Sequence, residues 1–194
     1  MIYNALQAVV SQLNDFLKVN FQQTEDKAIL GTILDEEGSV PEGNRNKVIM
    51  TVVNMDQETA AQWARTFVRE ERGGKKYELN NPLNFNVDIL VSTLFTDYDE
   101  SLKFLSEAIY FFQAKSVFTK EDTPKLPDNI QQLSFETIKL TYGEAHSLWT
   151  ALGAKYMPSV LFKMRMLSFQ NSERQEVYEV LYPVVVATPD HNMN

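Results

Sequence analysis

The sequence predicts a single α/β domain of the α+β kind, with a central mixed or mostly antiparallel sheet packed by three main helices. Apolar residues recur at helical spacing in three segments, and β-branched or alternating apolar runs lie between them. The chain has 194 residues, 44% of them hydrophobic and 11% aromatic, which suffices for one domain with a substantial core. Without an internal repeat or a linker, this order of segments favours helices packed on one sheet.

The N-terminal part combines a helix with two strands. Residues 2–19 have the period of an amphipathic helix. Residues 28–34 are a short apolar run that predicts a strand, and residues 47–55 are almost continuously apolar, as in a central strand covered on both faces. The apolar stripe of the helix consists of Ile2, Leu6, Val9, Leu13, Phe16 and Leu17, and its polar face of Asn4, Gln7, Ser11, Gln12, Asn14 and Lys18.

Residues 57–81 carry contradictory signals. The segment QETAAQWARTF can form a short helix, whereas the charges that follow it, Gly73-Gly74 and Pro82 interrupt regular structure. We expect most of this stretch to be an excursion or a mobile loop. Residues 84–95 then alternate apolar and polar side chains before becoming fully apolar, which predicts a strand.

A second helix is predicted over residues 99–113, with Asp97 or Asp99 as its N-cap. Apolar residues occupy more than half of its circumference, so we expect a largely buried helix. The predicted core-facing stripe consists of Leu102, Leu105, Ile109 and Phe112, and it is widened by Phe104, Ala108 and Phe111.

The C-terminal half adds two strands around a third helix. Strands are predicted at residues 133–139 and 159–169. Between them, Thr141 and Glu144 have the spacing of a capping box, and the helix that they open ends near Gly153.

The last residues form a further extended segment. Residues 177–187 are apolar and contain Pro183, which is typical of an edge strand or of a segment exchanged with another subunit. Pairing within its own subunit and pairing with a neighbour are equally compatible with the pattern. We divide the chain into a domain of residues 1–170 and a C-terminal extension or arm of residues 171–194.

Composition and charge exclude several classes of protein. The absence of cysteine excludes disulfides, thiolate nucleophiles, iron–sulfur clusters and Cys-bound zinc. The 18 basic and 26 acidic residues give a net charge of −8, spread over both halves, so neither half is a basic arm for nucleic acid. The N-terminus lacks the pattern of a signal peptide, and no apolar run is long enough to span a bilayer. We expect a soluble protein that is made in the cytoplasm.

The titratable residues form no recognisable catalytic pattern. His191 lies near the C-terminus, and His146 lies in a predicted helix without a nucleophile motif. A small hydrolase that uses Asp99 or Glu100 with His146 is the weaker hypothesis, because carboxylates at a helix start are typical of capping and dipole stabilisation.

Cofactor and metal sites are not predicted either. Asp35-Glu36-Glu37 could collect a hard cation, but consecutive residues in a turn rarely point at one ion, so a solvated turn is favoured. Gly73-Gly74-Lys75-Lys76 does not match a phosphate-binding loop. We expect no cofactor, no catalytic residue and no metal ligand.

Several long segments resemble a known family. They are MIYNALQAVVSQLNDFL, KAILGTILDEEGSV with KVIMTVVNMDQE, LFTDYDESLKFLSEAIYFFQAKSVFT, and LWTALGAKYMPSVLFKMRMLSF. Together, over residues 1–169, they resemble the cap or tail-terminator proteins of phage-tail-like contractile injection systems. The central helix and the LWTALGAKYMPS segment are the most specific parts.

The resemblance implies a structural protein. Members are expected to form a hexameric ring that closes the end of the particle distal to the baseplate, contacts the inner tube and the sheath, ends their polymerisation and links them. It implies other copies, sheath and tube proteins as partners, and neither nucleic acid nor membrane insertion. The particle is either released from the cell or anchored. A tube-completion or adaptor protein that contacts only the tube is the alternative within this class.

Two parts depart from the family pattern and are the predicted contact regions. The excursion of residues 57–81 carries large aromatic residues among polar ones, which favours a partner surface. The extension of residues 171–194 runs past the expected last strand. The predicted interface residues are Trp63, Phe67, Val180, Tyr182, Val184 and Val186.

Overall fold

The computed structural model describes residues 2–58, 68–72, 75–79, 83–128, 130, 132–169 and 175–176. In chain order, its elements are α1 (Ile2–Phe21), β1 (Ala28–Leu30), the 3-10 helix η1 (Glu42–Asn44), β2 (Lys47–Gln57), β3 (Val68–Arg72), β4 (Lys75–Leu79), β5 (Leu83–Leu94), α2 (Tyr98–Ala114), β6 (Val117–Thr119), β7 (Gln132–Ile138), α3 (Tyr142–Ala151), β8 (Ser159–Phe169) and β9 (Gln175–Glu176).

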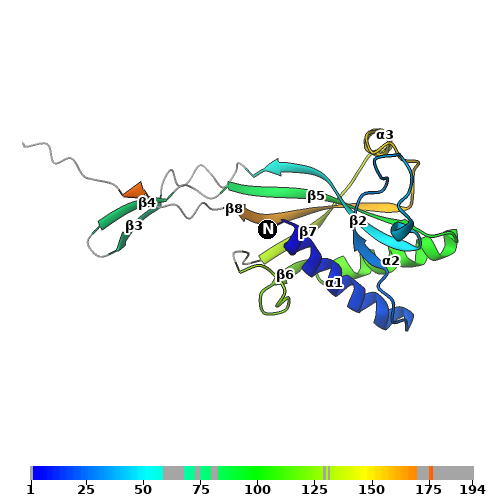
Figure 1. Cartoon of the computed structure of the whole chain (residues 1–194), viewed down its shortest axis with the longest axis horizontal. Coiled ribbons are helices and arrows are strands. Elements are labelled where there is room, and N and C mark those ends of the chain that lie inside the picture. Colours follow the sequence, from blue (N-terminus) through cyan, green and yellow to red (C-terminus); the bar gives the residue numbers. More distant parts are fainter. Residues whose placement is uncertain are drawn as a thin grey trace, which may run out of the picture.

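A six-stranded sheet forms the centre of the fold, in the order β1-β2-β5-β8-β7-β6 (Figure 1). Strand β1 runs parallel to β2, and the other neighbours are antiparallel. The long strands β2, β5 and β8 lie side by side, from the pair Lys47↔Leu94 at one end to Leu83↔Phe169 at the other. The prediction of a mixed, mostly antiparallel sheet with three helices is therefore confirmed.

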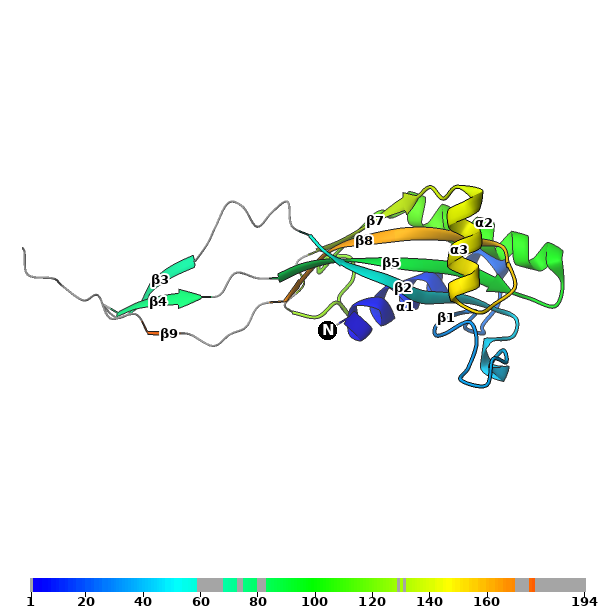
Figure 2. The same ribbon diagram turned by 90° about the horizontal axis from the view of Figure 1, so that it is seen from above.

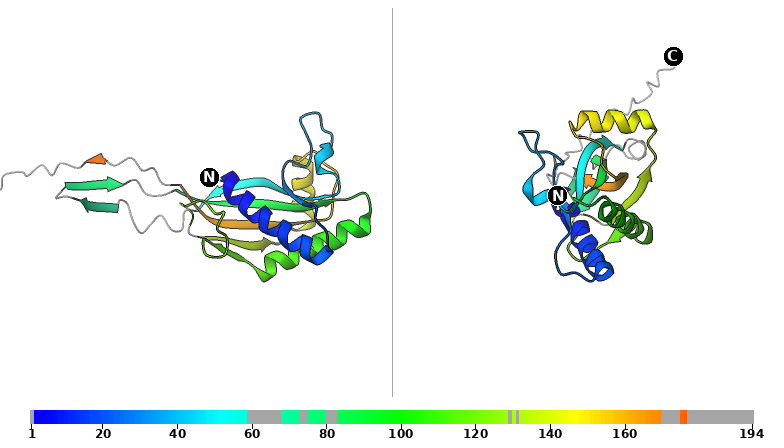
Figure 3. Two further views of the ribbon diagram at one scale, coloured as in Figure 1. Left: turned by 60° about the horizontal axis from the view of Figure 1, so that its bottom comes forward. Right: turned by 90° about the vertical axis from the view of Figure 1, so that its right-hand side faces the viewer.

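Helices α1 and α2 lie on one face of this sheet and enclose the larger core (Figure 3). Strand β5 turns its alternate residues Val87, Ile89 and Val91 into this core. Aromatic rings fill the space under α2, where Phe112 lies 4.6 Å from Phe162 and 4.9 Å from Phe135 between ring centroids. Burying rings of this size is a main source of stability for such a core.

Helix α3 crosses the strands on the opposite face (Figure 2). It buries Trp149 against Leu90 of β5 and Leu161 of β8, and Ile33 joins them from the segment after β1. The predicted capping box is present at the start of α3, where Glu144 N donates to Thr141 Oγ1 and Thr141 N donates to Glu144 Oε2. The central strands are thus covered on both faces where α3 and the segments beside it lie over them.

The stretch of residues 57–81 differs from the prediction of an excursion or loop. Strand β2 continues to Gln57, and β3 and β4 pair antiparallel from Val68↔Leu79 to Arg72↔Lys75. Strand β9 joins β4, so the three form a second sheet beyond the ends of the long strands (Figure 1). Five-residue strands rich in charge lack the apolar alternation that would have predicted them.

One smaller prediction, the length of the first strand, was wrong in extent. Strand β1 ends at Leu30 instead of residue 34, and Gly31 is held by a hydrogen bond from its N–H to Met50 O. Ile33 is nevertheless buried, because it packs under α3 from outside the strand. The division of the chain at residue 170 stays a prediction.

The core-facing side of α2 also differs from the prediction. Asp97 caps the helix by accepting a hydrogen bond from Asp99 N. Leu102 and Ile109, predicted to face the core, are 41% and 42% exposed, and the buried residues are Ser101, Phe104, Ala108, Phe111 and Phe112. A helix with apolar residues over a broad arc buries the side that carries its largest rings.

None of the described helices is long and apolar enough to cross a membrane.

Candidate assembly surfaces

The predicted interface residues lie outside the residues that the structure describes. They are Trp63, Phe67, Val180, Tyr182, Val184 and Val186. Their role in subunit or particle contacts stays a prediction.

The residues of the hydrolase hypothesis are not brought together. Asp99 and Glu100 lie in the first turn of α2, whereas His146 lies on α3, on the opposite face of the sheet (Figure 3). Glu100 forms an ion pair with Lys103 at 2.8 Å, and His146 Nδ1 lies 3.3 Å from Thr150 Oγ1 of its own helix. A shared acid–base site needs its groups within hydrogen-bond reach, so this constellation does not exist in the fold.

In the acidic turn after β1, the side chain of Asp35 forms hydrogen bonds with backbone N–H groups. Asp35 Oδ1 accepts hydrogen bonds from Glu37 N at 3.0 Å and Ser39 N at 2.8 Å. This is the local bonding typical of Asp in turns. Within the described parts of the chain, no group of three or more His, Asp or Glu residues is placed to hold a metal ion.

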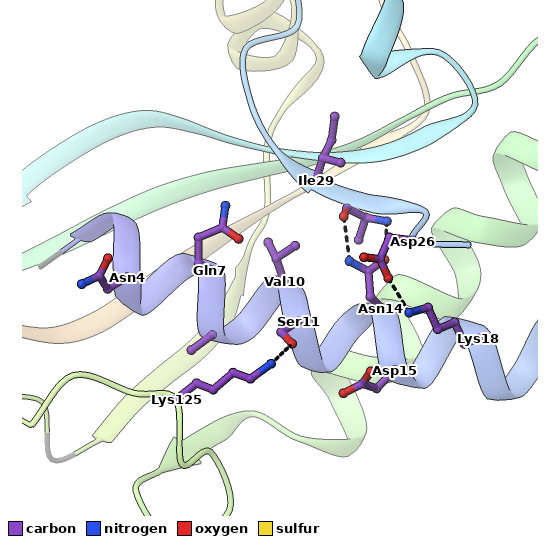
Figure 4. A pocket seen from close by; sticks show the side chains of 12 residues that line it. Asn4, Gln7, Val10, Ser11, Asn14, Asp15, Lys18, Asp26, Ile29 and Lys125 are labelled. Carbon is purple, nitrogen blue, oxygen red and sulfur yellow. Dashed lines mark hydrogen bonds and ion pairs between the residues drawn. The ribbon is translucent and has the colours of Figure 1, made fainter. Parts of the chain in front are cut away.

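Asn14 closes one edge of the sheet (Figure 4). Its Nδ2 donates to Ala28 O at 2.8 Å, and its Oδ1 accepts from Ala28 N at 2.7 Å and Lys27 N at 2.9 Å. Ala28 belongs to the edge strand β1, whose other side pairs with β2. The amide thus takes the place of a neighbouring strand, and it satisfies backbone groups that an edge would expose.

The buried position of Asn14 was missed by the sequence pattern. It was assigned to the polar, solvated face of the first helix, yet it is only 6% exposed. Its neighbours Leu13 and Leu17 are buried as well. A short amide side chain between two predicted core residues is the signal that could have indicated a buried polar role.

A polar groove of about 720 Å³ runs beside this closed edge (Figure 4). Its side chains pair with one another: Lys18 Nζ lies 2.6 Å from Asp26 Oδ1, and Lys125 Nζ donates to Ser11 Oγ at 2.9 Å. The hydrogen bond that Lys18 donates to Asp26 raises the pKa of Lys18 above its ordinary value. Ion pairs and hydrogen bonds within the groove thus satisfy part of its polar lining.

The opposite edge of the sheet is only partly covered. Strand β6 pairs with β7 from Thr119↔Gln132 to Val117↔Ser134, and Phe135 N donates to Ser116 O at 2.8 Å. Beyond this point, β7 continues to Ile138, and among the described residues only β8, on its inner side, pairs with it. Edges of this kind are where another strand can be added.

A cavity of about 960 Å³ adjoins the end of β7. Leu140, Trp149 and Ala154 form its apolar wall, together with Tyr142 and Tyr156. Trp149 and Tyr156 lie 5.8 Å apart in an edge-to-face arrangement, but Tyr142 and Tyr156 are 99% and 70% exposed. Exposed aromatic rings around an apolar hollow are typical of a surface that another chain covers.

Beyond α3, the same face of the sheet carries an ion-pair network. Lys163 Nζ lies 3.3 Å from Asp56 Oδ2 and 3.2 Å from Asp88 Oδ1. Arg165 pairs with Glu58 at 3.2 Å and with Glu136. Four strands contribute to this network, because β2, β5, β8 and β7 are neighbours in the sheet.

The network keeps its two cations charged. Burial by itself lowers the pKa of Lys163, but the hydrogen bonds and charges of Asp88 and Asp56 outweigh it, so its pKa is raised. The pKa of Arg165 is raised chiefly by its hydrogen bond with Glu136. Paired charges on an uncovered sheet face can orient a protein partner, whereas they offer no unpaired nucleophile or base.

Comparisons with known proteins agree with one another on the relationship. A family model described as the Pvc16 N-terminal domain matches residues 5–181. The fold is similar to a chain described as the PVC sheath/tube terminator of an extracellular contractile injection system, in its extended state, with a TM-score of 0.62 at 10% identity, over 100% of this chain. It is also similar to the tube-terminating cap of the anti-feeding prophage (AFP), with a TM-score of 0.54 at 12% identity, over 94% of this chain.

The match covers only part of those solved chains. It spans 64% of the PVC chain and 60% of the AFP chain, less than two thirds of each. A search of curated proteins gave no match.

Proposed function

Because the chain belongs to the family of the Pvc16 N-terminal domain, which matches residues 5–181, we propose that it is a non-enzymatic cap of a contractile injection system. It binds the end of the particle distal to the baseplate, stops the growth of tube and sheath and links the two. The observation that carries the proposal is this family match over nearly the whole chain.

The similarity of fold supports the same role. The two solved chains are described as a sheath/tube terminator and as a tube-terminating cap, and their folds follow this chain over its whole length or nearly so. The surfaces of the molecule suit attachment to proteins. They include a partly open sheet edge, an apolar hollow with exposed tyrosines and a face of paired charges. These features bind other chains and need no catalytic group.

The partners in this proposal are other copies of the chain and the sheath and tube proteins of one particle. A hexameric ring places the same surfaces at every subunit of the terminal layer. A ring of this kind is heterologous, since one patch of a subunit meets a different patch of the next. The site of action is then the assembled extracellular particle, with no cofactor required.

Imaging of particles tests the proposal. Without this protein, we expect tubes and sheaths of uncontrolled length, or tubes detached from sheaths, in negative-stain micrographs. Supplying the intact chain should restore particles of uniform length. Uniform and intact particles in its absence would contradict the role of a cap.

The same images separate the cap from an adaptor that contacts only the tube. The description of the AFP chain names the tube alone, which gives the adaptor some support. An adaptor predicts tubes of uncontrolled length inside sheaths of normal length. A cap that touches both predicts defects in both.

A paired substitution addresses the hydrolase hypothesis. The double variant His146→Ala with Asp99→Asn should support assembly and function of the particle at the level of the intact chain, because the two residues lie on opposite faces of the sheet. A variant that assembles normally but is inactive would restore the enzymatic reading.

A further inference from the structure

The two edges of the six-stranded sheet differ in how their outward backbone groups are paired. At β1, Asn14 bonds both outward backbone groups of Ala28, at 2.7 and 2.8 Å. At β7, the covering strand β6 ends after pairing with Gln132, Leu133 and Ser134. A buried side chain thus occupies the outward groups of Ala28 at the first edge, whereas the last residues of β7 keep outward groups that a further strand can use.

The open part of β7 is centred on Thr137. Phe135 N donates toward the β6 side, and strand geometry turns the N–H and C=O of Thr137, two residues later, to the same side. Thr137 is exposed, and β8 pairs with it only from the inner side, through Phe162. Among the described residues, no hydrogen bond to its outward N–H or C=O is found.

One side of a strand added here would meet α2. Glu107 of α2 bonds Asn20 of α1, and Ile109, two residues later, lies on the other side of the helix. Because α1 packs on β1 and α2 on β5 and β8, that side of α2 faces the β7 edge. It carries the apolar stripe of Leu102, Leu105 and Ile109, two members of which are more than 40% exposed.

The other side of the added strand would meet the apolar cavity by α3. Lys139 and Leu140, which line this cavity of about 960 Å³, follow β7 directly in the chain. An extended segment beside β7 therefore finds backbone partners along its edge and apolar surface on both of its faces. Edge pairing supplies affinity in such complexes, and side-chain pockets supply selectivity.

We propose that this edge receives residues 177–187 of a second copy of the chain. This segment, VYEVLYPVVVA, is the most β-branched and apolar stretch of the chain outside the described ranges. Its Pro183 lacks an N–H and so suits a strand that pairs on one side only. The occupant comes from another copy because β9, which ends just before the segment at Glu176, lies in the second sheet, away from the α3 end of β7 (Figure 2).

Glu176, which precedes the donor segment, and the acceptor end of β7 then lie far apart in one subunit (Figure 2). Each copy gives its terminal segment to the next and receives one from the previous copy. A contact between two different patches generates a ring when the rotation closes. This inference rests on the proposed function, and it assigns the contact that joins the subunits of the cap.

Mixed cysteine variants of the full chain test the contact directly, since the chain contains no cysteine. One copy carries Thr137→Cys, and a second copy with a different affinity tag carries Val180→Cys, Tyr182→Cys or Val184→Cys in turn. Particles assembled from the mixture are oxidised and separated on a denaturing gel. We expect disulfide-linked pairs of the two tagged copies from at least one donor position.

The matched control moves the acceptor cysteine to Val19, which is 76% exposed on α1. This pairing should give at least about tenfold less product, because a disulfide requires Cα atoms within roughly 7 Å. Product that forms equally well at Val19, or a Thr137→Cys cross-link to sheath or tube protein alone, would overturn the assignment of the occupant.

A second pair of variants tests the edge without cysteine. Thr137→Pro removes the outward N–H but leaves the β8 pairing of its neighbours Glu136 and Ile138 in place. Incorporation of this variant into particles should fall about tenfold, while Thr137→Val, which keeps the N–H, should incorporate normally. Circular dichroism checks that both variants fold. If Thr137→Pro does not fold, the cysteine cross-link alone tests the contact.

Different results would refute the contact between subunits and the role of the chain as a cap. Particles that contain the chain and have normal length but give no cross-link at residue 137, and tolerate Thr137→Pro, would refute this contact and leave the cap intact. A chain that never enters particles and has no effect on their length would refute the cap itself.

Discussion

At the scale of single residues, Asn14 shows how one side chain shapes the assembly properties of the fold. It lies between the buried Leu13 and Leu17 and makes three hydrogen bonds to the backbone of residues 27 and 28. It occupies backbone groups of Lys27 and Ala28 that another strand at the β1 edge would otherwise need. The same side chain also fixes the position of β1 against α1.

Removing this clamp should destabilise the protein. Asn14→Ala leaves the backbone groups of Ala28 and Lys27 without their partner, and a buried unpaired polar group costs about 1–3 kcal/mol. We expect the free energy of unfolding in urea to fall by about 2–4 kcal/mol. The matched control is Asn4→Ala, an exposed position on the same helix, for which a change below about 0.5 kcal/mol is expected. Equal effects of the two substitutions would contradict the clamp.

Asp122 gives the fold a measurable pH dependence. Burial is the largest single influence and raises its pKa, but hydrogen bonds from Thr123, from Thr119 N and from Lys115, with the charge of Lys115, together outweigh it and lower the pKa from 3.8 to about 2. A carboxyl with a lowered pKa stabilises the folded state above its unfolded pKa, and this contribution is lost as the pH falls toward the folded value. The stabilisation from Asp122 should therefore disappear between about pH 4 and pH 2.

Urea unfolding at several pH values checks this window. Asp122→Asn should make the free energy of unfolding less dependent on pH between about pH 4 and pH 2 than it is in the intact chain. The adjacent substitution Glu121→Gln serves as the control. A slope that stays the same in Asp122→Asn would show that other groups produce the acid sensitivity.

At the scale of elements, the sequence of α2 predicts a helix but does not show which of its faces is buried. Its apolar residues cover a broad arc, so more than one face could have met the sheet. Phe104, Phe111 and Phe112 take the core, where Phe104 stacks on Phe21 at 4.1 Å between centroids. The aliphatic stripe is left at the surface beside β7, where it is available to a partner.

Substitutions on the two faces of α2 should separate stability from assembly. Phe112→Ala leaves a cavity under the sheet and should lower the free energy of unfolding by about 3–5 kcal/mol. Leu102→Ser with Ile109→Ser should cost below about 1.5 kcal/mol, because both residues are about two-fifths exposed. Thermal unfolding measures the difference. If the double serine variant unfolds as readily as Phe112→Ala, Leu102 and Ile109 belong to the core after all.

At the scale of the whole molecule, the proposed contact between subunits depends on the terminal segment. Deleting residues 177–194 removes the proposed donor and leaves the six-stranded sheet, which pairs without it. We expect a folded chain by circular dichroism that forms fewer rings in light scattering. A truncated chain that assembles as the intact one does would exclude a role for the segment, and loss of folding would show that it completes its own sheet.

The two aromatic residues of the region between β2 and β3 provide an independent test. Replacing Trp63 and Phe67 together by Ser should weaken assembly into particles, because large aromatic residues among polar ones commonly mark a partner surface. Thermal stability should change little if the pair contacts only a partner. Unchanged assembly of the double variant would remove both from the predicted interface.

Much of the fold could be predicted because its patterns are local. Alternation indicated β5, the capping box indicated the start of α3, and the period of 3.6 residues indicated α1 and α2. Short strands escaped prediction, since β3, β4, β6 and β9 have at most five residues and obtain their stability from their neighbours. The contact surfaces escaped for a related reason: Thr137 becomes an open edge only because β6 ends early.

The sequence by itself determined that the chain forms one domain of helices on a mostly antiparallel sheet, that thiol chemistry is impossible and that the chain belongs to the family of the Pvc16 N-terminal domain. Only the tertiary structure decided which face of α2 is buried, that Asn14 closes β1 while β7 stays open, and that Asp99 and His146 lie apart. Periodicity and composition are properties of neighbouring residues, whereas burial and edge pairing depend on contacts between segments that are separated along the chain, and no local pattern records them.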